Sequence, residues 1–265
     1  MKIKEIVSAL EQFAPLPLQD GFDNAGLQIG LTDAEAAGAL LCLDVTEAVL
    51  DEAIALGYNL VISHHPLIFK GYKSITGKDY VERCILKAIK NDIVIYSAHT
   101  NLDNAYGGVN YKIAEKIGLK NLQVLEPKEN SLQDDLMQAG AGIVGELDEP
   151  ETELEFLKRI KKTFEVGCVR HNRLTGREIQ KVALCGGAGA FLLPQAIRAG
   201  ADVFITGEIK YHDYFGHEGD ILMAEIGHYE SEQYTKEIFY SIIRDLFPNF
   251  ALQSSKINTN PIKYL

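Results

Sequence analysis

Several features that would narrow the class of this protein are missing from its 265 residues. There is no tryptophan, and the four cysteines (Cys42, Cys84, Cys168 and Cys185) form no C-x-x-C pair and no zinc-knuckle spacing. Cys42 and Cys185 stand inside apolar runs, which favours buried structural thiols in a reducing compartment. No stretch approaches the roughly 20 apolar residues of a membrane span. The N-terminal residues mix charges among apolar positions, so we expect no signal peptide and a cytoplasmic location.

Positive charge is also scarce. Lys and Arg number 26 against 37 Asp and Glu, and the formal net charge is −11. An acidic surface repels phosphate backbones and anionic lipid, so we expect neither nucleic acid nor a membrane as partner. A small anionic substrate remains compatible with this charge, because metal ions in a cleft reverse the local field. Hydrophobic residues make up 46%, enough for a buried core.

Short apolar runs alternate with amphipathic segments through much of the chain, whereas GFDNAGLQIG (21–30) looks like a loop. We expect strands over 39–45, 59–63, 92–99, 141–147, 179–187, 201–208, 219–226 and 249–255, and helices over 3–13, 46–57, 78–91, 107–118, 151–164, 189–200 and 231–247. A strand, a crossover helix and a strand in this order imply parallel pairing. The sequence therefore predicts an α/β fold: two α/β lobes with mixed, largely parallel sheets and flanking helices.

The alternation loosens around 120–150, where LEPKENSLQDDLMQAG is polar and carries turn residues. We place a boundary near 125–130. Residues 1–125 plus 226–265 would form a metal-binding lobe, and residues 126–225 a second lobe that completes the cleft.

Histidines follow two of the predicted strands, and open α/β sheets bind ligands beyond the carboxyl ends of their strands. His64 and His65 stand in SHHP after one strand, and His99 and Asp103 stand in HTNLD after the next. Past a strand end the alternation of faces relaxes, so two adjacent imidazoles can face separate metal ions. The alternative is a pair of polar loop histidines, with Asp103 capping a turn.

His228 and Glu232 lie four residues apart, on one face of a helix that begins near Tyr229. The alternative for Glu232 is an exposed first-turn carboxylate that favours the helix dipole. Together with the strand-end residues, this pair makes a mixed nitrogen and oxygen set typical of zinc, iron, manganese or cobalt. Three histidines and two carboxylates, His64, His65, His228, Asp103 and Glu232, make five ligands, too many for one catalytic zinc with an open position. They fit two ions with a bridging carboxylate, a pair that activates water for hydrolysis.

A second group of candidates lies later in the chain. The turn GGAGA joins a strand to a helix, so the N–H groups of Gly186, Gly187 and Gly189 could bind an oxyanion; tight turn geometry is the alternative. In TGEIKYHDYF, Glu208 and His212 could reach the same cleft. His212 is a candidate proton shuttle, and a solvent-exposed surface histidine is the alternative.

The motifs FDNAGLQIG, SHHPLIF, HTNLD, TGEIKYHD and GHYESE occur in an order that resembles the NIF three-like family, whose members are often called GTP cyclohydrolase I type 2 homologues. The resemblance covers nearly the whole chain. It implies two metal ions and a toroidal homohexamer, a trimer of dimers. The metal ligands that it implies are His64, His65, Asp103, His228 and Glu232, with His99 nearby and Asp23 and Asn24 at the edge of the site.

Two residues depart from the pattern of this family. Phe22 stands where many relatives have Trp, and Glu208 where Asp is common. Neither lies in the implied metal set, so both bear on how a substrate fits.

The sequence thus predicts a dinuclear-metal-dependent hydrolase of a small, anionic, nucleotide-like substrate, with His99, Glu208 and His212 as candidate catalytic groups. If the cyclohydrolase name applies, water attacks C8 of guanine and formate is lost. Two alternatives stay open. Paired metals also serve phosphoester hydrolysis, and a ring-shaped assembly or binding protein could hold metals without turnover.

Overall fold

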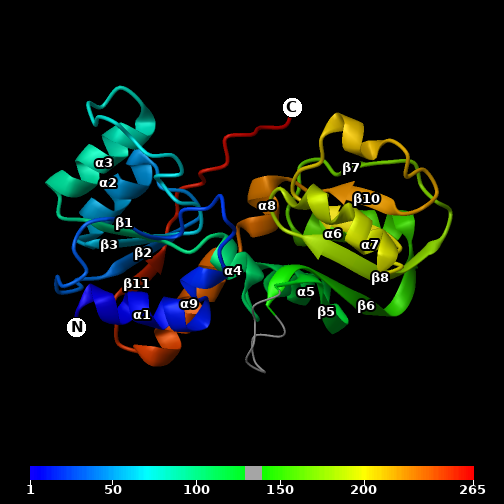
Figure 1. Cartoon of the computed structure of the whole chain (residues 1–265), viewed down its shortest axis with the longest axis horizontal. Helices are drawn as coiled ribbons and strands as arrows, with labels where there is room; N and C mark the ends of the chain where they lie inside the picture. The colour runs from blue at the N-terminus through cyan, green and yellow to red at the C-terminus, as the bar shows by residue number, and fades with distance from the viewer. Residues whose placement is uncertain (129–138) are drawn as a thin grey trace. The chain divides into compact units, whose positions relative to one another are not determined.

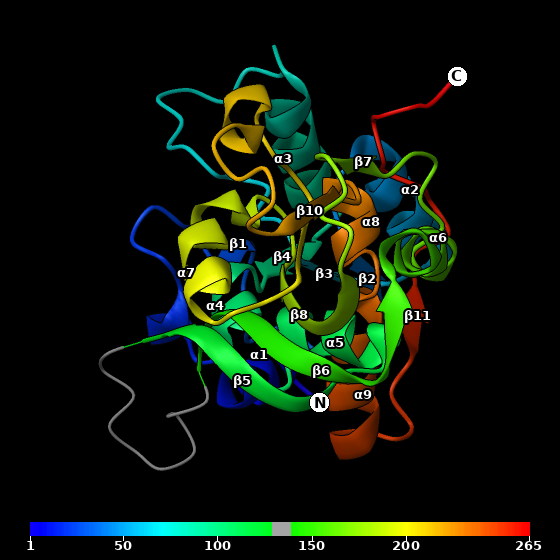
Figure 2. The ribbon, with the colours of Figure 1, turned by 90° about the vertical axis from the view of Figure 1, so that its right-hand side faces the viewer.

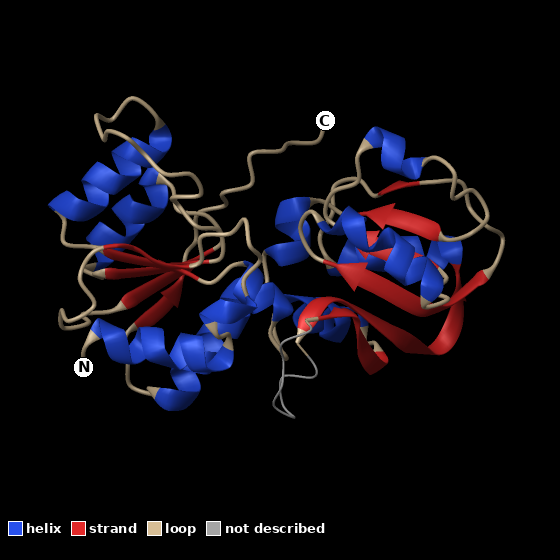
Figure 3. Cartoon of the chain, in the orientation of Figure 1, coloured by secondary structure: helices blue, strands red, loops and turns tan. Residues whose placement is uncertain are grey.

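The computed structural model describes residues 1–128 and 139–265, and the chain divides into two compact units. The first unit contains Met1–Leu102 and Thr235–Pro261, and the second contains Asp103–Tyr234 and Ile262–Leu265. Each unit has its own mixed sheet with flanking helices (Figures 1 and 3), which confirms the predicted α/β class. Most of the polar segment that we expected to separate two lobes lies outside the described residues.

The limits between the units fall at 102 and 234, whereas we expected lobe limits near 125 and 226. The helix α5 (Val109–Ile117), expected in the first lobe, packs against β6 (Gly140–Thr152) and β8 (Glu178–Cys185) of the second sheet. The short helix α8 (His228–Glu232) packs against α5 and therefore also belongs to the second unit.

Five short strands form the sheet of the first unit, in the order β1-β4-β3-β2-β11. They are β1 (Gly26–Ile29), β2 (Ala39–Cys42), β3 (Leu60–Ser63), β4 (Val94–Ser97) and β11 (Leu252–Ser254). The last four pair in parallel, and β2, β3 and β4 are buried along their whole length. Their carboxyl ends therefore meet at one edge of the sheet, where ligands of α/β proteins bind.

Helices cover both faces of this first sheet (Figure 3). They are α1 (Ile3–Phe13), α2 (Glu47–Leu56), α3 (Tyr80–Lys90) and α9 (Thr235–Leu246). On one face α2 packs against α3, and on the other α1 packs against α9. The hydroxyl of Thr46 accepts a hydrogen bond from the N–H of Val49 where α2 begins, and Gly57 ends α2 at φ +68°. These two signals are the ones that predicted this helix from the sequence.

The loop prediction for 21–30 was wrong in part, because Gly26–Ile29 form β1. This strand pairs antiparallel with β4, with Gly26 opposite Ser97. Its glycines and polar neighbours are typical of a loop, yet pairing with a buried strand supplies the backbone hydrogen bonds that its own sequence does not favour. As a result, the residues before β1 lie at the carboxyl end of β4.

The second unit has a six-stranded sheet in the order β5-β6-β8-β9-β10-β7 (Figure 2). Its other strands are β5 (Lys120–Pro127), β7 (Arg170–His171), β9 (Val203–Thr206) and β10 (Leu222–Glu225). Here β8, β9 and β10 pair in parallel, and the outer strands join antiparallel. The helix α6 (Glu153–Thr163) packs against β6 and β8, and α7 (Leu193–Arg198) lies in a core cluster with Phe204 and Met223.

Two further segments differ from expectation. No strand was expected at β5, whose residues are largely exposed and so lack an apolar pattern. The helix expected over 231–247 is divided into α8 and α9.

Two expectations drawn from composition can be compared with the fold. Cys42, Cys84 and Cys185 are buried, and Cys168 is exposed. Within the described part of the chain, no helix combines the length and the apolarity that crossing a bilayer requires.

Candidate metal centre

Three histidines gather at the carboxyl edge of the first sheet. His64 and His65 follow β3 directly, and His99 lies two residues beyond β4. One ring nitrogen from each lies within 4.8 Å of those of the other two. The ring centroids are 4.9 to 5.4 Å apart. Sequence reasoning placed His99 beside the metal set, whereas the structure groups it directly with His64 and His65.

Each of these three imidazoles has its Nδ1 atom held by an oxygen. The partners are the Ala98 carbonyl at 2.9 Å from His64, Asp44 Oδ1 at 2.7 Å from His65, and Asp23 Oδ1 at 2.7 Å from His99. A carbonyl or an ionised carboxylate can only accept, so each Nδ1 donates. Because a neutral imidazole carries one N–H, the lone pair able to bind a metal is then on Nε2.

Both aspartates behind the histidines are held in the ionised form. Burial raises the pKa of Asp23, but hydrogen bonds from His99 and Thr100 outweigh it and lower that pKa to about 2. Burial likewise raises the pKa of Asp44, and the hydrogen bond from His65 outweighs it, so the pKa is lowered. Carboxylates in this position orient a histidine ring and increase its basicity as a ligand.

Asp44 and its support were missed by sequence reasoning. Asp44 stands two residues beyond β2, the same strand-end position that pointed to the histidines, so the signal was present. Its Oδ2 accepts a hydrogen bond from the hydroxyl of Thr259, in the segment after β11. No local pattern marks Thr259, because the contact joins residues 215 positions apart.

The second unit holds the other predicted ligands. His228 is the first residue of α8, and its Nε2 lies 3.1 Å from Oε2 of Glu232, which is buried. One carboxylate oxygen of Asp103, on α4 (Thr100–Asn104), lies within 4.8 Å of one of Glu232. Two ionised carboxylates this close repel each other, and either a shared proton or a cation between them relieves the repulsion. The group is therefore a carboxylate-rich donor set, and a divalent cation fits it.

Glu208 stands behind His228 as the aspartates stand behind His65 and His99. Its Oε1 lies 2.8 Å from Nδ1 of His228. Its contact with His228 is that of a residue that orients a ligand, and the catalytic role suggested by the sequence stays a prediction. Glu208 also lines a cavity of about 310 Å³ together with Lys210 and Ala188.

The glycine turn has a different role from the predicted one. The N–H groups of Gly186, Gly187 and Gly189 donate to side chains of the protein, so an oxyanion site built from these three groups is not supported. Their acceptors are Asn110 Oδ1, Ser231 Oγ and Thr206 Oγ1. A Cβ on Gly187 would lie 2.3 Å from Oε1 of Glu232, and this glycine has φ +58°. The turn thus makes room for the Glu232 carboxylate.

Two further site residues predicted from the sequence are Asn24 and His212. Asn24 donates from Nδ2 to the Ile68 carbonyl, which ties together two loops of the first unit. His212 is exposed, and its ring contacts those of Tyr211 and Phe215. These contacts give no support to a proton shuttle, and that role stays a prediction.

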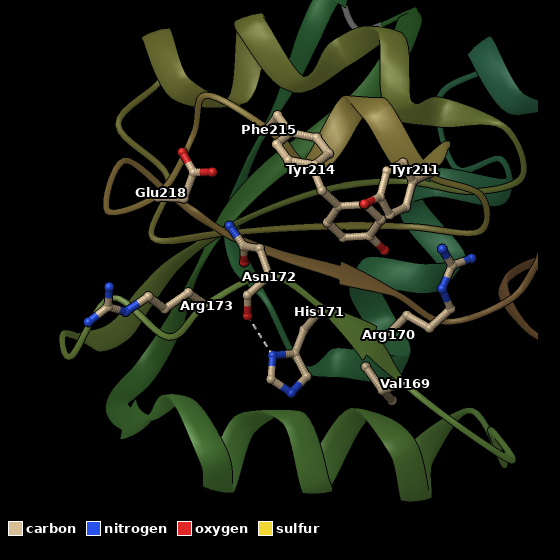
Figure 4. A pocket seen from close by; sticks show the side chains of 9 residues that line it. All are labelled: Val169, Arg170, His171, Asn172, Arg173, Tyr211, Tyr214, Phe215 and Glu218. Atoms are coloured by element: carbon tan, nitrogen blue, oxygen red, sulfur yellow. Dashed lines mark hydrogen bonds between the residues drawn. The ribbon is translucent and has the colours of Figure 1, made fainter.

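A cavity of about 590 Å³ lies elsewhere in the second unit, between the loop at β7 and the segment 211–218 (Figure 4). Tyr211, Tyr214 and Phe215 line it. Arg170 at its rim is paired with Glu225, which also accepts a hydrogen bond from Tyr214. Among residues 1–128 and 139–265, no group of three potential metal ligands includes a residue of this cavity.

Comparison with known proteins places the chain in a family. Residues 1–261 match the Duf34/NIF3 family (NGG1p interacting factor 3), and the chain belongs to it. A Clostridium perfringens protein named GTP cyclohydrolase 1 type 2 homolog is 37% identical over 88% of this chain and 87% of its own length. A Lactococcus lactis protein of the same name is 34% identical over 98% of both chains.

Solved structures give the same relationship. The crystal structure of a Staphylococcus aureus hypothetical protein has a TM-score of 0.91 at 31% identity, covering 100% of this chain and 99% of its own. A Bacillus cereus protein described as related to NIF3 has a TM-score of 0.90 at 27% identity, with the same coverage. The family resemblance inferred from the motifs is therefore confirmed.

Proposed function

We propose that this protein is a metal-dependent hydrolase in which the donor sets of its two units together carry two divalent ions. The observation that supports it most is the trio of His64, His65 and His99, with every Nδ1 engaged by an oxygen and one nitrogen of each ring within 4.8 Å. Surface histidines have no need of such support, whereas metal-binding histidines usually have it. Zinc, iron and manganese suit the mixed nitrogen and oxygen donors.

The residues around the donors have separable tasks in this proposal. Asp44, Asp23 and Glu208 orient His65, His99 and His228. Gly187 leaves space for Glu232. Divalent ions held there would supply the Lewis acidity that activates water and offsets the charge that develops in hydrolysis.

The proposed substrate is a small, anionic, nucleotide-like molecule. The name of the relatives suggests opening of the guanine ring of GTP, and paired metals also suit phosphoester hydrolysis. Purified protein loaded with zinc, iron or manganese should be incubated with GTP and with a panel of phosphoesters. Formate without phosphate supports ring opening, and phosphate without formate supports a phosphoesterase.

Whether the ions form one dinuclear centre can be tested with manganese. Metal analysis should find two ions per chain, and the electron paramagnetic resonance spectrum of the manganese-loaded protein should show exchange coupling between them. Both His65→Ala and Glu232→Ala should abolish that coupling. Two isolated manganese signals, each lost in only one variant, would contradict a shared centre.

The alternative function is a ring-shaped assembly or binding protein. The family resemblance implies a homohexamer, and the cysteines and the N-terminal residues favour the cytoplasm. Both features stay part of the proposal. The assembly function is favoured if the wild-type protein turns over no compound of a wide substrate panel and the His65→Ala variant loses both the metal and the hexamer. Loss of turnover with an intact hexamer favours the hydrolase.

A further inference from the structure

Two large aromatic side chains of the first unit are exposed beside the histidine trio. Phe22 is 68% exposed and Phe69 is 46% exposed. Their ring centroids lie 6.4 Å apart with an interplanar angle of 51°, and the Phe69 ring lies 6.3 Å from that of His99. Aromatic rings usually gain their stabilisation by burial, so an exposed pair next to polar donors indicates a binding surface.

The loops that carry these rings are tied to each other. Asn24, two residues after Phe22, donates from Nδ2 to the Ile68 carbonyl. The N–H of Ile68 donates to Oε1 of Gln28 at 3.2 Å. Asp23, between Phe22 and Asn24, accepts hydrogen bonds from His99 and Thr100. Each phenylalanine therefore neighbours a residue fixed by a contact between loops, which lowers the entropic cost of binding a ligand.

We propose that Phe22 and Phe69 bind the flat heteroaromatic ring of the substrate and hold it beside His99. Because the two rings are tilted by 51°, a planar ligand ring stacked on one of them would not lie parallel to the other, and both stacked and tilted arrangements are favourable for aromatic groups. Stacking accepts any base, because every base has a π-face. The inference rests on the proposed function, since it takes the histidine trio as the place of reaction.

The charge of the protein supports recognition through the ring. With a net charge of −11, the chain repels polyphosphates at long range. Lys70 follows Phe69 and is exposed, where a lysine interacts only weakly with an anion because solvent screens it. In the metal-free protein the base is therefore the larger source of affinity, whereas bound metal ions would reverse the local field and attract the phosphate.

The absence of tryptophan makes this inference directly measurable. Phe22→Trp places a single indole at the proposed ring site of the full-length protein. Guanosine and adenosine should quench its fluorescence, and ribose 5-phosphate at equal concentration should not. Adding Phe69→Ala should weaken nucleoside binding about ten-fold or more, because stacking dominates such sites, whereas Phe69→Tyr should preserve it.

A matched control is Tyr240→Ala in the same Phe22→Trp background, since Tyr240 is 40% exposed on α9 of the same unit. It should leave nucleoside binding unchanged, and circular dichroism should verify that every variant is folded. Equal binding of ribose 5-phosphate and guanosine, or an unchanged affinity in a folded Phe69→Ala variant, overturns the inference.

Metal analysis of the same samples separates the inference from the proposed function. If the protein takes up no metal but binds nucleosides in a Phe69-dependent way, the hydrolase proposal fails and the ring site stands. If it takes up metal and Phe69 has no effect on nucleoside binding, the ring site fails by itself.

Discussion

Asp44 Oδ1 and His65 Nδ1 lie 2.7 Å apart, beyond the carboxyl ends of β2 and β3, which pair in parallel. The pairing of the two strands brings the carboxylate to the imidazole, although the two residues are 21 positions apart. The contact sets the orientation and the protonation of the His65 ring.

Replacing Asp44 by Asn should weaken metal binding about 10- to 100-fold, because the amide keeps an acceptor but removes the negative charge behind His65. Competition with a coloured chelator measures the affinity. Asp51→Asn is a suitable control, since Asp51 is an exposed carboxylate on α2 that pairs with Lys87. Equal affinities of wild type and Asp44→Asn would refute a role for Asp44 in supporting a ligand.

Thr259→Val should have a smaller effect in the same direction, a few-fold loss of metal affinity, because it removes only a hydrogen bond to Asp44. Thr259→Ser keeps the hydroxyl and should behave like the wild type. The chelator competition again gives the measurement. A valine variant with a wild-type value would show that Asp44 holds His65 without this support.

Gly187→Ala should lose metal, because the added Cβ would lie 2.3 Å from Oε1 of Glu232 and displace it. Gly57→Ala is a matched control: its φ is also positive, at +68°, but a Cβ there meets nothing within 4 Å. Both variants should lose about 1–2 kcal/mol of stability from backbone strain. Only Gly187→Ala should change metal content, and similar metal loss in both would mean that strain alone is responsible.

Glu82 should make stability depend on pH under acidic conditions. Burial raises its pKa, but hydrogen bonds from Thr76 and Lys78 outweigh burial and lower the pKa from 4.5 to about 2. A pKa depressed by folding stabilises the folded state fully above the unfolded value. This contribution is lost as the pH falls through 4.5 toward 2.

Glu82→Gln should therefore be less stable than wild type at pH 7, and the difference should shrink toward pH 2. Urea unfolding at a series of pH values measures this. Glu115→Gln, at an exposed position on α5, should show no such trend. A constant difference between wild type and Glu82→Gln at all pH values would contradict the assignment.

Local sequence signals predicted much of the fold, because they act within a few residues. Thr46 and Gly57 mark the ends of α2, and apolar runs mark β2, β3 and β4. Strand β1 was not predictable in this way, since its pairing with β4 comes from a neighbour 71 positions away, as the partners Gly26 and Ser97 show. Strand β5 was missed for a similar reason. Its residues are largely exposed and show no apolar pattern, so only its pairing with β6 defines it as a strand.

The candidate site follows the same division. The sequence by itself determined that histidines and carboxylates stand at strand ends and at the start of α8, because motif and strand-end position are local properties. Only the tertiary structure decided that Asp44 holds His65, that Thr259 holds Asp44, and that Gly187 makes room for Glu232. These relationships are contacts between side chains and backbone far apart in the chain, and no local pattern encodes which distant residues will meet.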